Sequence, residues 1–250
     1  MEQVPNKRPY GLIGSGRAAR HFARYLALLN IPFKTWARRE DLGVSPAQKL
    51  QDCGTLLLLI RDGAIDSFIQ QNPEIKQHRL VHFSGALTIK GCYGTHPLTS
   101  FGHDLENLEY YEQIVFVSEK ADCNFKELFP ELSNTFFSIE PSHKPLYHAL
   151  CVLSGNFSVL LWQKLFEGLR TLNISEAAGQ HYLQAVTQNI LRNPGAALTG
   201  PLARGDQGTL TKNFTALEGD PFQRVYAAFT QAFQERNLRD ETHSNDSRLL

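Results

Sequence analysis

The chain has 250 residues, 42% of them hydrophobic, and its 25 lysines and arginines are balanced by 25 aspartates and glutamates. This composition is typical of a folded globular protein of one or two domains. The lack of net positive charge argues against a nucleic-acid partner, and no apolar run approaches the roughly 20 residues of a membrane helix. We therefore expect a cytoplasmic protein that binds neither nucleic acid nor membrane.

The cysteines and histidines show no metal-binding spacing. Cys53, Cys92, Cys123 and Cys151 are widely scattered and form no CxxC pair, and the nine histidines include no HExxH motif. Zinc sites and disulfide frameworks usually show close, regular spacings. We expect small buried thiols and no bound metal.

Short β-rich runs alternate with helical patterns between residues 10 and 140. Strands are predicted at residues 10–13, 33–37, 55–60, 80–84, 114–118 and 135–139, and an amphipathic helix at 17–29. Several runs are continuously apolar, as strands buried on both faces are. The pattern predicts an α/β fold with a Rossmann-like, doubly wound, mainly parallel sheet.

Beyond residue 141 the strand patterns stop and long helical patterns follow. We expect an NADP-binding domain over 1–141 and an all-helical domain over 142–250, with a flexible polar tail from about residue 239. The segment 146–169 is apolar almost all round, which predicts burial in the centre of the second domain or in a subunit interface. So apolar a helix in so small a domain favours a homodimer formed through the helical domain.

The stretch GSGRAA, residues 14–19, fits the pattern G-x-G-x-x-A. The first glycine permits a tight turn, the second lets a pyrophosphate approach the backbone, and Ala19 lets the helix pack closely on the strand. An ordinary turn can carry the same glycines, but the position between a predicted strand and a predicted helix favours a dinucleotide site. The residues expected to hold the phosphates are Gly14, Ser15, Gly16, Arg17 and Ala18.

The end of the second predicted strand, TWARRE, indicates which dinucleotide binds. Arg38 and Arg39 stand where an NAD site carries an acid, and Trp36 offers a surface near the adenine. We therefore expect NADPH as the cofactor. The structural alternative is a solvated pair of arginines.

Three further segments follow predicted strands, where ligands bind in such sheets. Ile60 and Arg61 are expected beneath the nicotinamide, and Asp62 is expected to cap the next helix. Ser84 is expected to contact the cofactor carboxamide or the substrate, with Gly85 beside it. His96 precedes a proline in a predicted extended turn, where it is either structural or a substrate contact.

Seven stretches together resemble a bacterial family in which a Rossmann-like domain precedes a helical domain of formerly unknown function: GLIGSGRAARHFA, WARR, IRDGAI, VHFSGAL, THPLTSF, KPLYHALCVLSGNF and LTGPLARGD. The resemblance spans about residues 8–238. The family is similar to the wider group of 6-phosphogluconate dehydrogenase, 3-hydroxyisobutyrate dehydrogenase, pyrroline-5-carboxylate reductase and ketopantoate reductase. It implies an NADPH-dependent oxidoreductase, with reduction of 2-dehydropantoate to pantoate for pantothenate and coenzyme A synthesis as the expected activity.

The resemblance also implies site residues. In the wider group a lysine on the first long helix after the Rossmann domain acts as acid or base, and an asparagine about one turn later holds the substrate. Lys144 and Asn156 take these places here, although they are twelve residues apart.

The chemistry of a 2-oxo acid points to the same part of the chain, because its reduction needs a proton donor and groups that bind a carboxylate. We expect Lys144, His148 and Asn156 to be catalytic. The residues expected to bind the substrate are Ser84, Gly85, His96, Tyr147, Asn156 and Arg204.

Structural alternatives exist for these residues. Lys144 can be a solvated residue before a helix, His148 a core histidine, and Asn156 a buried amide. The LTGPLARGD segment can be a plain connection between helices, with Asp206 as a cap. Two other functions fit the same motifs: an NADP-dependent imine or hydroxyacid oxidoreductase, and an NADP-binding sensor without turnover.

Overall fold

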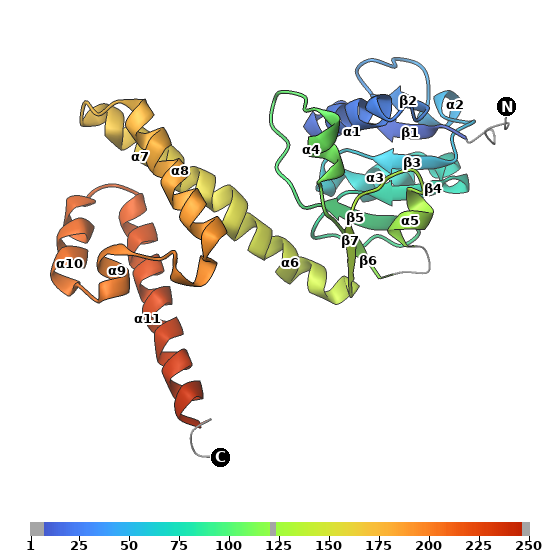
Figure 1. Ribbon diagram of the computed structural model, residues 1–250. Helices are drawn as coiled ribbons and strands as arrows, with labels where there is room; N and C mark the ends of the chain where they lie inside the picture. The colour runs from blue at the N-terminus through green and yellow to red at the C-terminus, as the bar shows by residue number, and fades with distance from the viewer. Residues whose placement is uncertain (1–7, 121–123, 247–250) are drawn as a thin grey trace. The chain divides into compact units, whose positions relative to one another are not determined.

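The computed structural model describes residues 8–120 and 124–246 (Figure 1). The chain divides into two compact units, 1–161 and 162–250. This division comes later than the boundary expected at residue 141. The reason is that the helix following the last strand starts on the sheet, where its first residue, Lys144, is buried.

A seven-stranded sheet in the order β2-β1-β3-β4-β5-β6-β7 forms the centre of the first unit. Strands β1 to β5 run parallel, β6 is antiparallel to β5, and β7 is parallel to β6. The expected Rossmann-like, mainly parallel sheet is therefore confirmed. The strands are β1 (Tyr10–Ile13), β2 (Phe33–Trp36), β3 (Thr55–Leu58), β4 (Arg79–His82), β5 (Tyr93–Pro97), β6 (Phe116–Glu119) and β7 (Phe136–Ile139).

Strand β5 corrects one expectation, because His96 lies in a strand and not in an extended turn. Gly94 and Pro97 obscure the strand pattern, since both residue types are depleted in strands. Pro97 is tolerated as the last residue of the strand. The strand pairs with both β4 and β6, so it lies inside the sheet.

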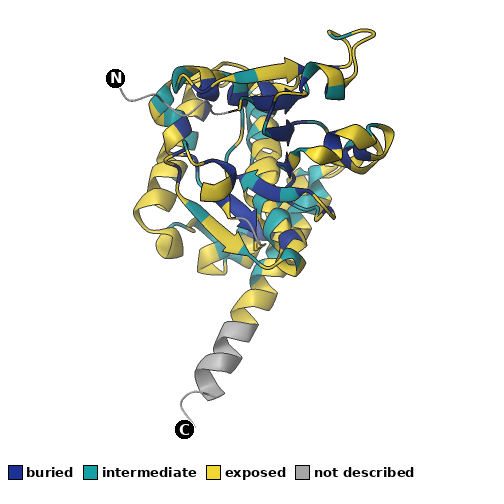
Figure 2. Ribbon diagram, turned by 90° about the vertical axis from the view of Figure 1, so that its right-hand side faces the viewer, coloured by how far each residue is buried: buried dark blue, intermediate teal, exposed yellow. Residues whose placement is uncertain are grey.

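Helices cover both faces of this sheet, with a separate apolar core on each face. Leu57 of β3 packs in the core that includes Phe22, whereas Leu56 and Leu58 pack in the core that includes Ile65. Figure 2 shows the central strands as the most buried part of the chain. The helices that precede β7 are α1 (Arg17–Leu28), α2 (Pro46–Lys49), α3 (Asp62–Gln71), α4 (Leu108–Glu112), α5 (Phe125–Leu128) and a 3₁₀ helix, Pro73–Gln77.

Two of the three described cysteines agree with the prediction of buried thiols. Cys53 and Cys92 are buried free thiols and Cys151 is half-buried, whereas Cys123 lies outside the described residues. Burial raises the pKa of the Cys92 thiol to about 12, so it remains protonated at neutral pH.

After β7 the chain is helical. One continuous run passes through the 3₁₀ turn Pro141–His143, α6 (Lys144–Cys151), a π-helical segment (Val152–Asn156) and α7 (Phe157–Thr171). The helices that follow are α8 (Glu176–Arg192), a 3₁₀ turn (Pro194–Ala196), α9 (Gly200–Arg204), α10 (Gln207–Ala216) and α11 (Phe222–Asp246). The flexible tail expected from about residue 239 is thus helical as far as Asp246.

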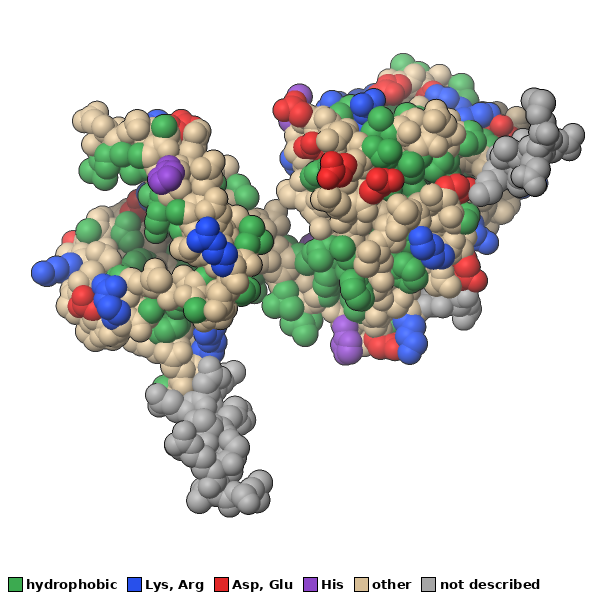
Figure 3. Space-filling model, in the orientation of Figure 1, with side chains coloured by type: hydrophobic (Ala, Val, Ile, Leu, Met, Phe, Trp, Pro, Cys, Tyr) green, Lys and Arg blue, Asp and Glu red, His purple; other side chains and the backbone are tan. Residues whose placement is uncertain are grey.

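The apolar run 141–171 is not buried as expected in the centre of the second unit. Its large side chains Leu146, Leu150, Leu153, Phe157 and Leu160 are exposed. Among the described residues it is the one helix that is long and apolar enough to cross a membrane, judged by length and composition alone. A helix covered by another subunit can have the same composition. Figure 3 shows hydrophobic side chains on the surface of both units.

Candidate active site

A cavity of about 480 Å³ lies at the carboxyl ends of β1, β2 and β3. Ligands of open α/β sheets bind at this edge, because the loops after parallel strands gather there. One face of α3 forms a further wall. The lining residues are Gly14, Ser15, Gly16, Trp36, Ala37, Arg38, Arg39, Leu59, Ile60, Arg61, Ala64, Ser67 and Phe68.

The glycine loop has the backbone that a phosphate cradle requires. Gly14 has φ +132°, and a Cβ at this position would lie 2.3 Å from the Leu59 carbonyl oxygen. A Cβ on Gly16 would instead meet nothing within 4 Å. Gly16 caps α1, and the N–H groups of the first turn have no acceptor within the helix. The loop therefore presents backbone donors to an anion at the floor of the cavity.

The loop after β2 holds two arginines at the cavity. Arg38 and Arg39 are exposed and form no ion pair among the described residues. The nearby Asp41 carboxylate accepts hydrogen bonds from the Ala37 N–H, at 2.8 Å, and from Lys49. The bond from Lys49 lowers the pKa of Asp41. Because this carboxylate is engaged within its own loop, it does not compete for the arginines.

Most of the residues expected to bind the cofactor line this cavity, but three do not. Arg17 donates to the carbonyl of Phe101, at 3.5 Å, and neither Ala18 nor Ser84 is among the lining residues. Sequence reasoning missed Ala37, Leu59 and the helix α3 residues Ala64, Ser67 and Phe68. Together with Arg61, these α3 residues recur at intervals of three or four, which places them on one face of a helix. The sequence could therefore have indicated that this helix face lines the cavity.

Ser84 and Asp62 have roles different from those expected. The Ser84 hydroxyl donates to Asp62 Oδ2, at 2.5 Å, and accepts from the N–H groups of Ala86 and Leu87. A hydroxyl has one hydrogen and two lone pairs, so Ser84 has no capacity left for a substrate or a carboxamide. Asp62 is the first residue of α3 and not its cap, which is Arg61.

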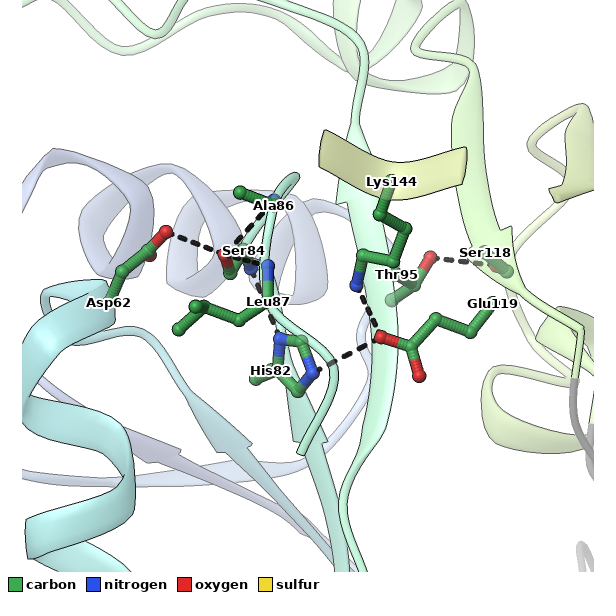
Figure 4. A network of polar contacts seen from close by, with 9 residues as sticks. All are labelled: Asp62, His82, Ser84, Ala86, Leu87, Thr95, Ser118, Glu119 and Lys144. Atoms are coloured by element: carbon green, nitrogen blue, oxygen red, sulfur yellow. Dashed lines mark hydrogen bonds and ion pairs between the residues drawn. The ribbon is translucent and has the colours of Figure 1, made fainter. Parts of the chain in front are cut away.

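Beyond this loop, three residues form a row across the sheet. His82 of β4 pairs with Gly94 of β5, and the register of β5 with β6 places Gly94 opposite Glu119. Because Gly94 has no side chain, those of His82 and Glu119 meet above it, with 3.6 Å between His82 Nε2 and Glu119 Oε1 (Figure 4). A Cβ on residue 94 would lie 2.2 Å from Glu119 Oε1.

Lys144 completes this cluster from above. Its side chain is 4% exposed, and Nζ donates a hydrogen bond to Glu119 Oε1. Burial lowers the pKa of Lys144, although Glu119 opposes the shift. Burial would raise the pKa of Glu119, but its contacts with His82 and Lys144 outweigh burial and lower it. Lys144 is therefore a buried, paired group and not the solvated residue of the alternative interpretation.

Four more of the expected residues lie together beside this cluster. His96 Nδ1 lies 2.8 Å from the Tyr147 hydroxyl, and its ring packs at 5.8 Å against the ring of His148. His148 also packs against Gly85, where a Cβ would lie 2.5 Å from the His148 ring. Burial, followed by His148, lowers the pKa of His96 to about 4, so His96 is neutral at pH 7.

The structure does not join the remaining two expected residues to the cluster. Asn156 is exposed at the end of the π-helical segment. Arg204 is an exposed residue at the end of α9, in the second unit. Asp206 caps α10 by accepting from the Thr209 N–H, at 3.0 Å, as the structural alternative predicts. The roles of Asn156 and Arg204 remain predictions.

Comparisons with known proteins agree with this architecture. Residues 115–233 match the family model described as a domain of unknown function, DUF2520. No curated protein sequence matches the chain. The expected resemblance to a Rossmann-like family with a helical domain of formerly unknown function is thus confirmed for the domain and the fold.

Solved structures share the fold over almost the whole chain. An inferred NADP oxidoreductase of Bacteroides fragilis has a TM-score of 0.73 at 19% identity, covering 92% of this chain and 98% of that one. Protein TM1727 of Thermotoga maritima has a TM-score of 0.60 at 22% identity, covering 93% and 99%. Pyrroline carboxylate reductase of Plasmodium falciparum, solved with NADP bound, has a TM-score of 0.57 at 13% identity, covering 92% and 98%.

Proposed function

We propose that the chain is an NADPH-dependent reductase of a small carbonyl compound. The observation that carries this proposal is the cavity whose floor is the glycine loop and whose mouth holds Arg38, Arg39 and Arg61. The N–H groups at the start of α1 suit a pyrophosphate. Planar guanidinium groups suit a 2′-phosphate better than a ribose hydroxyl. The similarity of fold to a reductase solved with NADP supports the same cofactor.

The buried cluster provides the proton. When bound, the cofactor supplies a hydride, and the oxygen that gains the electron pair needs one proton. Lys144 is our proton donor, because burial lowers its pKa, which makes its ammonium group more acidic than that of a surface lysine, while Glu119 accepts a hydrogen bond from Nζ. His96 is neutral, so it serves as the hydrogen-bond partner of Tyr147.

Contacts connect the cluster with the cofactor cavity. Arg61 lines the cavity, and the next residue, Asp62, accepts a hydrogen bond from Ser84. Gly85 follows Ser84 and packs against His148. The loop after β4 therefore links the residues that line the cofactor cavity with those of the buried cluster.

For the substrate we propose a 2-oxo acid, with 2-dehydropantoate as the first compound to test. In this assignment Asn156 orients the carbonyl compound and Arg204 binds its carboxylate through a two-pronged hydrogen bond. Both roles rest on the sequence resemblance and on the chemistry of the two side chains.

An imine is the second candidate, and the charge of the cluster favours it. Asp62 and Glu119 carry two negative charges against the single positive charge of Lys144, while His96 is neutral. A protonated imine is a cation, which this balance would stabilise. The similarity to pyrroline carboxylate reductase points in the same direction.

One experiment tests both the cofactor and the substrate. NADPH oxidation is followed with 2-dehydropantoate, other 2-oxo acids and pyrroline-5-carboxylate, and binding of NADPH and NADH is measured by calorimetry. Arg38→Ala with Arg39→Ala should weaken NADPH binding by about tenfold to a hundredfold and leave NADH binding nearly unchanged, since charged hydrogen bonds are worth about 1.5–3 kcal/mol each.

Arg20→Ala with Arg24→Ala provides the matched control, because both arginines are exposed on α1 outside the cavity. Equal loss of both nucleotides in the Arg38 and Arg39 variant would contradict the NADPH assignment. Turnover of the imine alone would select the second candidate. Tight NADPH binding without turnover of any compound would indicate a sensor.

We also propose that the exposed face of the run 141–171 is covered by a second copy of the chain. Leu146, Leu150, Leu153, Phe157 and Leu160 are exposed apolar side chains of this run, as at the seam between two subunits. The same run carries Lys144, Tyr147 and His148 against the sheet. A homodimer would cover this face without removing those contacts.

A further inference from the structure

Two buried groups adjoin the proposed proton donor: Glu119 contacts Lys144, and His82 in turn contacts Glu119. His82 is fully buried at the end of β4 and Glu119 is 8% exposed at the end of β6. The side chains of His82 and Glu119 meet because the intervening strand has a glycine at the same level, and Glu119 there contacts Lys144. Burying a carboxylate and an ammonium group is costly unless their geometry is favourable, so this arrangement calls for a function.

We propose that Glu119 and His82 are positioning residues: Glu119 holds the Lys144 ammonium group over Gly94, and His82 holds the Glu119 carboxylate. This inference rests on the proposed reductase function. Gly94 and His96 are two residues apart and so face the same side of β5. Holding Lys144 over Gly94 therefore fixes the ammonium group on the side of the sheet that carries His96, Tyr147 and His148.

His82 acts as an orienting group and not as a proton relay. Its Nδ1 accepts from the backbone N–H of Ser84, at 3.3 Å, so a ring hydrogen lies on Nε2, which faces Glu119 Oε1 at 3.6 Å. The ring is 0% exposed, so it has no direct contact with solvent. It anchors Glu119 to the loop that Ser84 and Asp62 hold.

Charged and titratable groups face Lys144 from every element packed around it. They are Glu119 from β6, Asp62 from α3, Cys92 before β5 and His96 from β5, while His82 of β4 faces Glu119 and His148 of α6 faces His96. Glu119 is the one that hydrogen-bonds to Nζ. Removing its charge leaves the ammonium group buried without a paired anion, so Lys144 should lose its proton at a lower pH.

Glu119→Gln tests the proposal. Lysine labelled with carbon-13 at Cε reports the titration of Lys144 by NMR, and loss of the signal in Lys144→Arg assigns it. We expect the Glu119→Gln midpoint to move at least one pH unit lower, with the alkaline fall of kcat moving by the same amount. kcat at neutral pH should fall about a hundredfold, as misplacing a reacting group does, while KM for NADPH stays within about twofold.

His82→Phe should move the midpoint in the same direction by a smaller amount. The matched controls are Glu140→Gln, an exposed glutamate paired with Lys120, and His21→Phe, another buried histidine. Neither control should move the Lys144 midpoint. An unchanged midpoint in a folded Glu119→Gln protein would overturn the proposal. If no substrate is reduced, the reductase function fails, whereas the NMR titration still decides whether Glu119 governs Lys144.

Discussion

Gly94 shows how a single missing side chain creates the polar cluster. It occupies the middle of a three-strand row, and its neighbours His82 and Glu119 fill the space above it. A Cβ there would also lie 2.6 Å from Lys144 Nζ. Glycine within a strand often marks such a close approach. In the sequence alone this glycine is typical of a turn. The side chains that require a glycine here, His82 and Glu119, lie on neighbouring strands and not near it in the sequence.

Gly94→Ala should therefore disrupt both the cluster and the sheet. The added methyl group overpacks a buried site, which typically costs about 1–3 kcal/mol of unfolding free energy. Reductase activity should fall together with stability. Urea unfolding and the substrate assay provide the measurements.

Gly63→Ala is the control for this substitution. Gly63 lies in α3, and a Cβ there meets nothing within 4 Å. Alanine is favoured over glycine in helices by about 1 kcal/mol. This variant should be at least as stable as the parent protein, and equal destabilisation by both substitutions would contradict the overpacking argument.

At the scale of elements, the loop after β4 is a structural joint between the sheet and α3. Ser84 satisfies two backbone N–H groups of its own loop and binds Asp62 at the start of α3. A serine after a buried strand in this fold class was a reasonable ligand candidate. The structure shows that its hydroxyl is fully used.

Ser84→Ala should lower stability with little effect on substrate binding. Loss of the hydroxyl leaves two N–H groups and one carboxylate without their partner, which we expect to cost about 1–3 kcal/mol. The midpoint of urea unfolding should fall while KM for the substrate stays within about twofold. Ser154→Ala, on an exposed hydroxyl bonded within its own helix, is the control. A large rise in KM with unchanged stability would restore Ser84 as a substrate ligand.

The π-helical segment Val152–Asn156 changes the phase of its helix. A π-bulge behaves as one inserted residue, so the eight residues from His148 to Asn156 count as about seven. Seven residues make nearly two turns of an α-helix. The bulge therefore brings Asn156 closer to the face that carries His148 than the spacing of a regular helix would.

At the scale of the whole molecule, the exposed apolar run 141–171 carries both the surface proposed for dimerisation and residues of the buried cluster. The helix that presents Leu150 and Leu153 outward holds Lys144 and His148 against the sheet. Covering its outer face with a second copy would bury leucine side chains worth about 1.5–3 kcal/mol each. Dimerisation is therefore expected to stabilise the helix that carries the proton donor.

Leu150→Asp with Leu153→Asp should yield a monomer, because two charges would be buried in the seam. Sedimentation velocity measures the change in mass. Leu42→Asp is the control, since Leu42 is 81% exposed in the loop after β2. The same mass for the parent and the double variant would contradict a dimer formed through this helix.

Residue patterns along the chain determined the glycine loop, the arginine pair and the order of sheet and helices, because each depends on neighbours a few residues away. They also placed Lys144, Tyr147, His148, Gly85 and His96 among the site residues, and the structure brings these five together. Strand β5 was missed because Gly94 and Pro97 are atypical of strands.

Only the tertiary structure decided which groups surround Lys144. Glu119 is 25 residues away and His82 is 62 residues away along the chain, and neither belongs to a local motif. The parallel and antiparallel pairing of β4, β5 and β6 sets them at one level of the sheet. From the sequence alone, a lysine is expected to be a solvated cation. Burial in the folded protein lowers the pKa of Lys144, and the neighbouring Glu119 carboxylate opposes that shift.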